Sequence, residues 1–184
     1  MLVKGCVVLT TTLSAVLTAG CASVPSKGGF ADVQRMVGER TGLTVHWDQG
    51  TPEDQAVKDH IQLLLQEPLT AKTAVQIALL NNPVLQATYE ELGIAQADLV
   101  QAGLLQNPVF IGSWRSSSHT SVLNSEYAFV QNFLDLFLLP LRKKLAAAQF
   151  EQAKLRVSDA VLGFSVQVRT AYYTLQGTEQ VHKM

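Results

Sequence analysis

The chain has 184 residues, of which 47% are hydrophobic and 16% are charged, and its formal net charge at pH 7 is −1. Soluble proteins usually carry roughly 25% charged residues, so this composition favours more surface in contact with lipid or partner subunits than with water. Nucleic-acid binding needs a concentrated basic surface, whereas no basic cluster here exceeds Arg142-Lys143-Lys144. The composition therefore argues against nucleic acid as a partner.

Residues 1–20 have the pattern of a signal peptide. Lys4 is followed by a short apolar run over Val7–Leu17, and small residues precede Cys21. A cysteine directly after Ala-Gly resembles the end of a bacterial lipoprotein signal, although Thr18 stands where that pattern prefers leucine. The resemblance implies cleavage before Cys21, acyl chains such as palmitate on that residue and, because Ala22 follows it, sorting to the outer membrane. The alternative is an ordinary secretory signal that contains a cysteine by chance.

Residues 21–68 are expected to form an N-terminal tether followed by short periplasmic helices. The stretch 22–30 is rich in small and polar residues, which is typical of a tether. We expect a short helix over Ala31–Glu39 and a brief extended piece at Thr44–Trp47. A second helix should start after Thr51, which is followed by proline, and should end before Pro68.

Helical patterns lie on both sides of residues 108–134. On the first side, Thr70 is expected to cap a helix that reaches Asn81, and Pro83 predicts a kink before a second pattern over residues 84–105. In that second pattern large residues recur every seven positions and small residues follow three positions later, which is typical of closely packed, coiled-coil-like helices. The large residues are Leu85, Leu92 and Leu99, and the small ones are Thr88, Ala95 and Ala102.

The returning helix is expected to begin at Pro140 and to continue to the last residues. At ~1.5 Å per residue it would extend about 60 Å, which is too long for one small compact domain. Its apolar residues form two stripes, and two stripes indicate two helical neighbours, as in a bundle or a closed ring of helices. The first stripe is Leu141, Ala148, Leu155 and Leu162; the second is Val157, Val161, Phe164, Val168, Ala171 and Leu175.

Between the helical patterns, two strands are predicted over Pro108–Ser116 and Ser125–Leu134. Their alternation places aromatic residues on one side and polar residues on the other, over about 9–11 residues each, which is the pattern of a transmembrane β-hairpin. The lipid-facing candidates are Phe110, Trp114, Tyr127, Phe129 and Phe133; the lumen-facing candidates are Ser113, Arg115, Glu126 and Asn132. A soluble hairpin is the alternative. One hairpin cannot close a sheet in a membrane by itself, because open edges are not stable there.

Three stretches resemble TolC-family outer-membrane efflux proteins. They are Leu69–Gln86, Ala95–Pro108 and the Ala-Tyr-Tyr-Thr-Leu run at Ala171–Leu175. The resemblance covers residues 69–184, which would be the first and incomplete one of two helix–hairpin–helix repeats, so we expect a longer gene product. It implies a mainly α homotrimer that pools its hairpins into an outer-membrane β-barrel and its long helices into a periplasmic α-barrel.

The same resemblance implies a passive exit duct of a tripartite efflux or secretion system. Its partners would be a periplasmic adaptor, an inner-membrane pump and outer-membrane lipid, and no cofactor would be required because the pump supplies the energy. The solute, which would be selected by the pump, is not evident from the sequence.

No catalytic constellation is evident. None of His46, His60, His119 and His182 pairs with another histidine, a cysteine or a carboxylate at metal-ligand spacing, and no nucleophile elbow, P-loop or dinucleotide motif occurs. We therefore expect a protein that is not an enzyme and holds no metal. A periplasmic coiled-coil lipoprotein such as an efflux adaptor is the main alternative, although an adaptor would carry a β-domain flanking its helices. A secreted enzyme that lacks its catalytic half is the other alternative.

Overall fold

The computed structural model describes residues 27–117 and 120–184. Cys21, the signal peptide and His119 lie outside the described residues. The fold is mainly helical, with one two-stranded antiparallel sheet. Its elements in chain order are α2 (Phe30–Thr41), α3 (Pro52–Leu64), α4 (Ala71–Asn81), α5 (Pro83–Ala102), β1 (Val109–Ser117), β2 (Thr120–Val130) and α6 (Leu134–His182).

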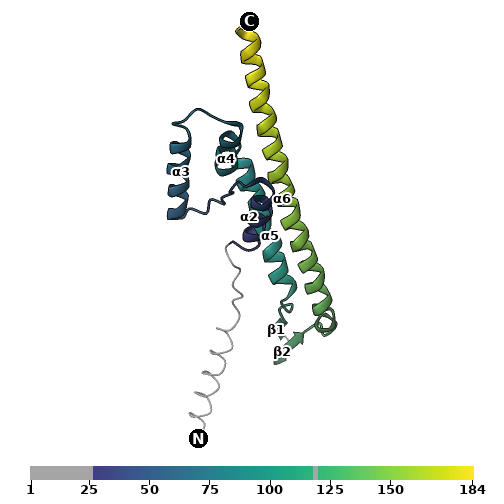
Figure 1. Cartoon of the computed structure of the whole chain (residues 1–184). Coiled ribbons are helices and arrows are strands. Elements are labelled where there is room, and N and C mark those ends of the chain that lie inside the picture. Colours follow the sequence, from purple (N-terminus) through teal and green to yellow (C-terminus); the bar gives the residue numbers. More distant parts are fainter. Residues whose placement is uncertain (1–26, 118–119) are drawn as a thin grey trace.

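Helices α5 and α6 lie side by side, and the β1–β2 hairpin connects them at one end (Figure 1). Helix α4 precedes α5 along the same side of α6, α2 packs against α6, and α3 packs against α4. The last part of α6 extends beyond all the other helices to the C-terminus. The predicted order of helices, hairpin and returning long helix is confirmed.

Local capping explains where these helices begin and end. The side chain of Thr70 accepts a hydrogen bond from the Thr73 amide at 3.1 Å, and Asn82 Oδ1 accepts from the Val84 amide at 2.8 Å. Because Pro83 follows Asn82 and fixes the first turn of α5, the chain breaks between α4 and α5 as predicted. Helix α2 ends at Gly42, whose φ of 64° is a left-handed conformation that glycine adopts without strain.

The core brings together residues that are far apart in the sequence. An aromatic cluster of Phe30, Trp47 and Tyr89 lies at its centre, with ring centroids 5.0 Å apart for Phe30 and Tyr89 and 5.6 Å apart for Phe30 and Trp47. Fully burying an apolar side chain stabilises a fold by about 1.5–3 kcal/mol. The other buried apolar residues of this cluster are Val33, Val37, Leu43, Val45, Val75, Leu79, Leu85, Leu92, Val157 and Val161. Part of the segment expected to be a tether and short helices is therefore built into the core.

Three predicted boundaries at the hairpin are wrong. Strand β2 begins at Thr120 rather than at Ser125. Strand β2 ends at Val130 rather than at Leu134, so Asn132 and Phe133 lie outside the hairpin strands. Helix α6 begins at Leu134 rather than at Pro140, because Asn132 Oδ1 accepts a hydrogen bond from the Leu134 amide at 3.1 Å and starts the helix earlier. Proline is common in the first turn of a helix, and this preference placed the expected start six residues too late.

Candidate membrane-facing site

The register of the hairpin sorts its side chains onto two faces. Phe110 pairs with Phe129, and Gly112 pairs with Tyr127, while Ser113 pairs with Glu126 on the neighbouring register positions. Directly paired residues lie on the same face of a sheet, and successive residues alternate between faces. Four lipid-facing candidates therefore share one face: Phe110, Trp114, Tyr127 and Phe129. Three lumen-facing candidates share the other: Ser113, Arg115 and Glu126.

Aromatic side chains on this face of the hairpin contact one another. Trp114 Nε1 donates a hydrogen bond to Tyr127 Oη at 3.2 Å, and the two rings are nearly perpendicular at a centroid distance of 6.1 Å. A Cβ atom at Gly112 would lie 3.6 Å from the Tyr127 ring, an ordinary van der Waals distance, so the ring lies beside this glycine of the neighbouring strand. The indole N–H thus has a partner within the hairpin. A donor without a partner would be costly in lipid.

The opposite face is polar only in the half near the turn. The register places Val109, Ile111, Ala128 and Val130 on this face near the base of the hairpin. Val109, Ile111 and Val130 are each more than half exposed. The base of the hairpin is therefore apolar on both faces, and the described residues do not cover it.

Exposed apolar residues continue from the hairpin into the first turns of α6. Phe110 and Trp114 are each 71% exposed, and Phe137 is 80% exposed. The same part of the chain has further exposed apolar or aromatic residues: Tyr127, Phe129, Phe133, Leu134, Leu136 and Leu138. Monomeric soluble proteins rarely expose contiguous apolar patches larger than a few hundred Å². This end of the molecule is suited to contact with lipid or with other subunits.

The two predicted apolar stripes of α6 differ in burial. Val157 and Val161 of the second stripe are fully buried, and Phe164 and Val168 pack against the same core, whereas Ala171 and Leu175 farther along are exposed. In the first stripe, Leu141 and Leu155 are exposed, as is Ala148, and Leu162 is half-buried. The chain thus supplies one of the two neighbours predicted for α6. The first stripe, together with the exposed Leu145, is named the open stripe.

Strong polar contacts join the N-terminal segment to α6. Lys154 Nζ lies 2.6 Å from Asp32 Oδ2 and 2.8 Å from Glu151 Oε1. Burial would lower the pKa of Lys154, but its hydrogen bonds to these two carboxylates outweigh burial and raise that pKa. The hydrogen bond from Lys154 lowers the pKa of Asp32. Nearby, Gly28 passes so close to α5 that an added Cβ atom would lie 1.1 Å from Gln96 Oε1. Residues 28–32, which follow Cys21 in the sequence, are therefore packed against α5 and α6.

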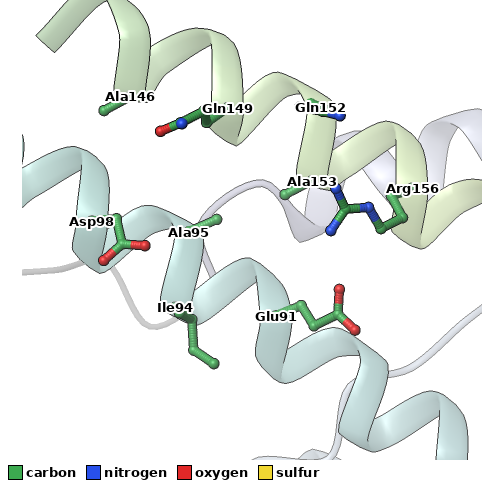
Figure 2. A pocket seen from close by; sticks show the side chains of 9 residues that line it. All are labelled: Glu91, Ile94, Ala95, Asp98, Ala146, Gln149, Gln152, Ala153 and Arg156. Atoms are coloured by element: carbon green, nitrogen blue, oxygen red, sulfur yellow. The ribbon is translucent and has the colours of Figure 1, made fainter. Parts of the chain in front are cut away.

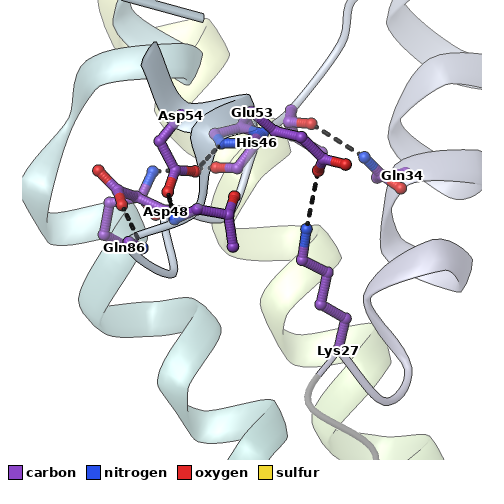
Figure 3. A network of polar contacts seen from close by, with 10 residues as sticks. Lys27, Gln34, His46, Asp48, Glu53, Asp54 and Gln86 are labelled. Atoms are coloured by element: carbon purple, nitrogen blue, oxygen red, sulfur yellow. Dashed lines mark hydrogen bonds and ion pairs between the residues drawn. The ribbon is translucent and has the colours of Figure 1, made fainter. Parts of the chain in front are cut away.

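A second polar network positions the start of α3 (Figure 3). His46 Nε2 lies 2.6 Å from Asp54 Oδ1, and the Thr51 amide donates to Asp54 Oδ2. Gln86 of α5 donates to the His46 carbonyl at 2.9 Å and accepts from the Asp48 amide at 2.8 Å. Burial would raise the pKa of Asp54, but the hydrogen bonds from His46 and Thr51 outweigh it and lower the pKa to about 2. Sequence spacing gave no signal for the His46–Asp54 pair.

A groove of about 400 Å³ lies between α5 and α6 (Figure 2). Ala95, Ala146 and Ala153 are the small residues at its lining, Ile94 is a larger apolar one, and the other lining side chains are charged or amides. Those polar residues are Glu91, Asp98, Gln149, Gln152 and Arg156.

Within residues 27–117 and 120–184, no cluster of three or more His, Cys, Asp or Glu side chains could hold a metal ion. Among the helices of this same part of the chain, none is long and apolar enough to cross a membrane.

The chain was compared with models of known protein families, with curated proteins and with solved structures, and none of the three comparisons gives a match. The class that the described residues define is a mainly helical protein with one antiparallel hairpin whose aromatic residues are exposed.

Proposed function

We propose that this protein is an outer-membrane exit duct of the TolC type, which passes the substrates of an inner-membrane pump without using energy itself. One observation carries the proposal: the hairpin register gathers four exposed aromatic residues on one face and Ser113, Arg115 and Glu126 on the other. An apolar outside and a polar inside is the arrangement of transmembrane β-strands that surround water. The hairpin lies at the end of two long antiparallel helices, as a periplasmic duct would require.

A hairpin inserted alone would leave unpaired N–H and C=O groups on both edges in lipid, and each such group costs several kcal/mol. Pooling strands from several copies removes these edges. The apolar residues on both faces of the hairpin base, and the open stripe of α6, offer surfaces for neighbouring copies. These features support a homotrimer in which the strands form one outer-membrane β-barrel and the long helices form a periplasmic α-barrel.

The proposed lipid anchor is compatible with the position at which the N-terminal segment packs against α5 and α6. Gly28 is the seventh residue after Cys21, and seven steps of extended chain reach at most about 25 Å. Lys143 of α6 lies near Gly103 at the α5 end that leads to the hairpin, because a Cβ atom added at Gly103 would be 3.8 Å from the Lys143 side chain. From Phe150, which lies against Gly29, to Lys143 the helix rises only about 10 Å. An acylated Cys21 could therefore lie in the leaflet that surrounds the hairpin base. The further partners under this proposal are a periplasmic adaptor and an inner-membrane pump, and no cofactor is needed.

The two tryptophans provide a direct test, because Trp47 is 2% exposed and Trp114 is 71% exposed. Single-tryptophan variants Trp47→Phe and Trp114→Phe are reconstituted in vesicles whose phospholipids carry bromine on the acyl chains. Bromine quenches only a tryptophan that contacts it. We expect strong quenching of the Trp114 emission in Trp47→Phe, and little quenching of Trp47 in Trp114→Phe.

Equal and weak quenching of both tryptophans in a protein that stays attached to the vesicles would refute the transmembrane hairpin. Such a result would favour a periplasmic coiled-coil lipoprotein. A second pair of variants reports on the two faces: cysteines at positions 110 and 113 should differ in reaction with a lipid-soluble thiol reagent, with position 110 the more reactive. Equal labelling of the two positions would contradict the assignment of faces.

A further inference from the structure

The contacts of α6 point in four distinct directions around its axis between Leu141 and Ser158. At about 100° per residue, Ala146 and Ala153, which are buried beside α5, lie about 140° from the centre of the open stripe. Both α5 and the open stripe are apolar contact directions, so they mark the two neighbours of α6 in a larger assembly. The remaining two directions are the one that meets α2 and the one that bears the groove.

Helix α2 and the groove lie on opposite sides of α6. Lys154 bonds to Asp32 and Ser158 Oγ lies 3.9 Å from Met36 Sδ, so these α6 residues face α2. Gln149 lines the groove and lies about 140° around the helix from Lys154 and about 180° from Ser158. The α5–α6 pair thus has one side covered by α2 and another side that is open and polar.

In a closed ring of helices, the angle between the two neighbours of any helix is smaller than 180° on the inner side. The angle of about 140° between α5 and the open stripe is measured across the groove, so the groove lies on the inner side of such a ring. The position of α2 gives an independent argument. The segment before α2 leads to the proposed lipid anchor, and bilayer lipid lies outside a barrel, so the α2 side is the outer one.

We infer that the groove-bearing face of α5 and α6 lines the duct, and that Glu91, Asp98 and Arg156 meet the passing solute; this inference rests on the proposed function. Figure 2 shows Glu91 extending from α5 toward α6 and Arg156 extending from α6 toward α5. Among the ion pairs of residues 27–117 and 120–184, none joins Arg156 to either carboxylate, and all three residues are exposed. Gln149 and Gln152 add neutral amide groups, so charged and amide side chains line the groove along two turns of α6, with the exposed Ile94 of α5 beside them.

The charges in this face predict which solutes it favours. Each copy presents two carboxylates and one guanidinium, and confined charges of one sign raise the local concentration of the opposite ion. The excess of one negative charge in each copy should therefore favour inorganic cations over anions at this level of the duct. Removing the carboxylates or the guanidinium should shift this preference in opposite directions.

The orientation of the groove is tested on the full-length protein extracted from membranes, with a single cysteine at Gln149 or, as the outer-face control, at Arg35 of α2, whose side chain is 61% exposed. Each variant is treated with a small maleimide and with a maleimide attached to a large polyethylene glycol. We expect the small reagent to label both positions and the large reagent to label only position 35, because the duct excludes it. Equal labelling of both positions by the large reagent in an assembled trimer would overturn the inference and leave the proposed function standing.

A second measurement uses conductance across planar bilayers under a potassium chloride gradient. The double variant Glu91→Gln/Asp98→Asn should move the reversal potential toward anions, Arg156→Gln should move it toward cations, and Arg35→Gln should leave it unchanged. If the trimer conducts but the groove variants leave the reversal potential unchanged, only this inference is overturned. A protein that is monomeric by mass in detergent and gives no conductance would overturn the proposed function, and the inference with it.

Discussion

Two tryptophans with opposite surroundings divide this molecule into two regions. Trp47 is 2% exposed, contacts Phe30 and donates its Nε1 hydrogen bond to Glu90 at 3.0 Å. Trp114 is 71% exposed on the hairpin, although its Nε1 also has a partner. Around Trp47 the chain buries its aromatic residues Phe30 and Tyr89 as well. At the hairpin end it cannot, because two strands have no second layer to pack against. Under the proposed function, lipid and other copies of the chain would complete the contacts of the hairpin.

The largest difference between the two regions should appear on truncation of these tryptophans. Trp47→Ala removes a buried side chain from the core and should lower the free energy of unfolding by about 3–5 kcal/mol. Trp114→Ala changes an exposed position and should alter it by about 0.5 kcal/mol or less in detergent. Urea denaturation followed by circular dichroism measures both changes. Equal losses of stability would show that the hairpin is packed within the protomer.

The next effect concerns the contact between α2 and α6. Asp32→Asn weakens the charge-assisted hydrogen bond from Lys154, and we expect a loss of about 1–2 kcal/mol because Asp32 is partly exposed. Glu151 still compensates the Lys154 charge. The matched control is Asp159→Asn, which changes an exposed carboxylate on the same helix. If the two variants unfold at the same denaturant concentration, the Asp32–Lys154 pair does not hold α2 in place.

The His46–Asp54 network predicts a pH dependence within the helical module. The pKa of Asp54 is lowered from 3.8 to about 2, so its ionised form stabilises the folded state. This contribution is complete above about pH 4 and is lost as the pH falls through about 2. Denaturation midpoints measured between pH 5 and pH 2 should fall more steeply for the parent protein than for Asp54→Asn. Parallel curves would mean that Asp54 ionises equally in the folded and unfolded states.

The smallest effect on protomer stability should come from the open stripe. Leu155 is 58% exposed, so Leu155→Gln should change the free energy of unfolding by about 0.5 kcal/mol or less. It should nevertheless weaken the homotrimer, because in the proposed ring this leucine packs against a neighbouring copy. Analytical ultracentrifugation compares it with Leu63→Gln, a similarly exposed leucine on α3 at 61%. Unchanged assembly of Leu155→Gln would place the subunit contact elsewhere.

Local signals were sufficient to predict most elements. Thr70, Pro83 and the seven-residue spacing from Leu85 gave the helices before the hairpin, because caps and proline act within a few residues. Alternation likewise predicted the faces of the hairpin. It did not predict its end, because the Asn132 side chain starts α6 and Pro140 is accommodated inside the helix.

Only the tertiary structure decided which apolar residues form the core and which remain open. The sequence by itself determined that α6 carries two stripes, and the fold assigned Val157 and Val161 to the core and left Leu155 exposed. It also joined Asp32 to Lys154 and His46 to Asp54. The physical reason is that periodicity defines the side of a helix on which a residue lies, whereas the partner on that side comes from distant parts of the chain.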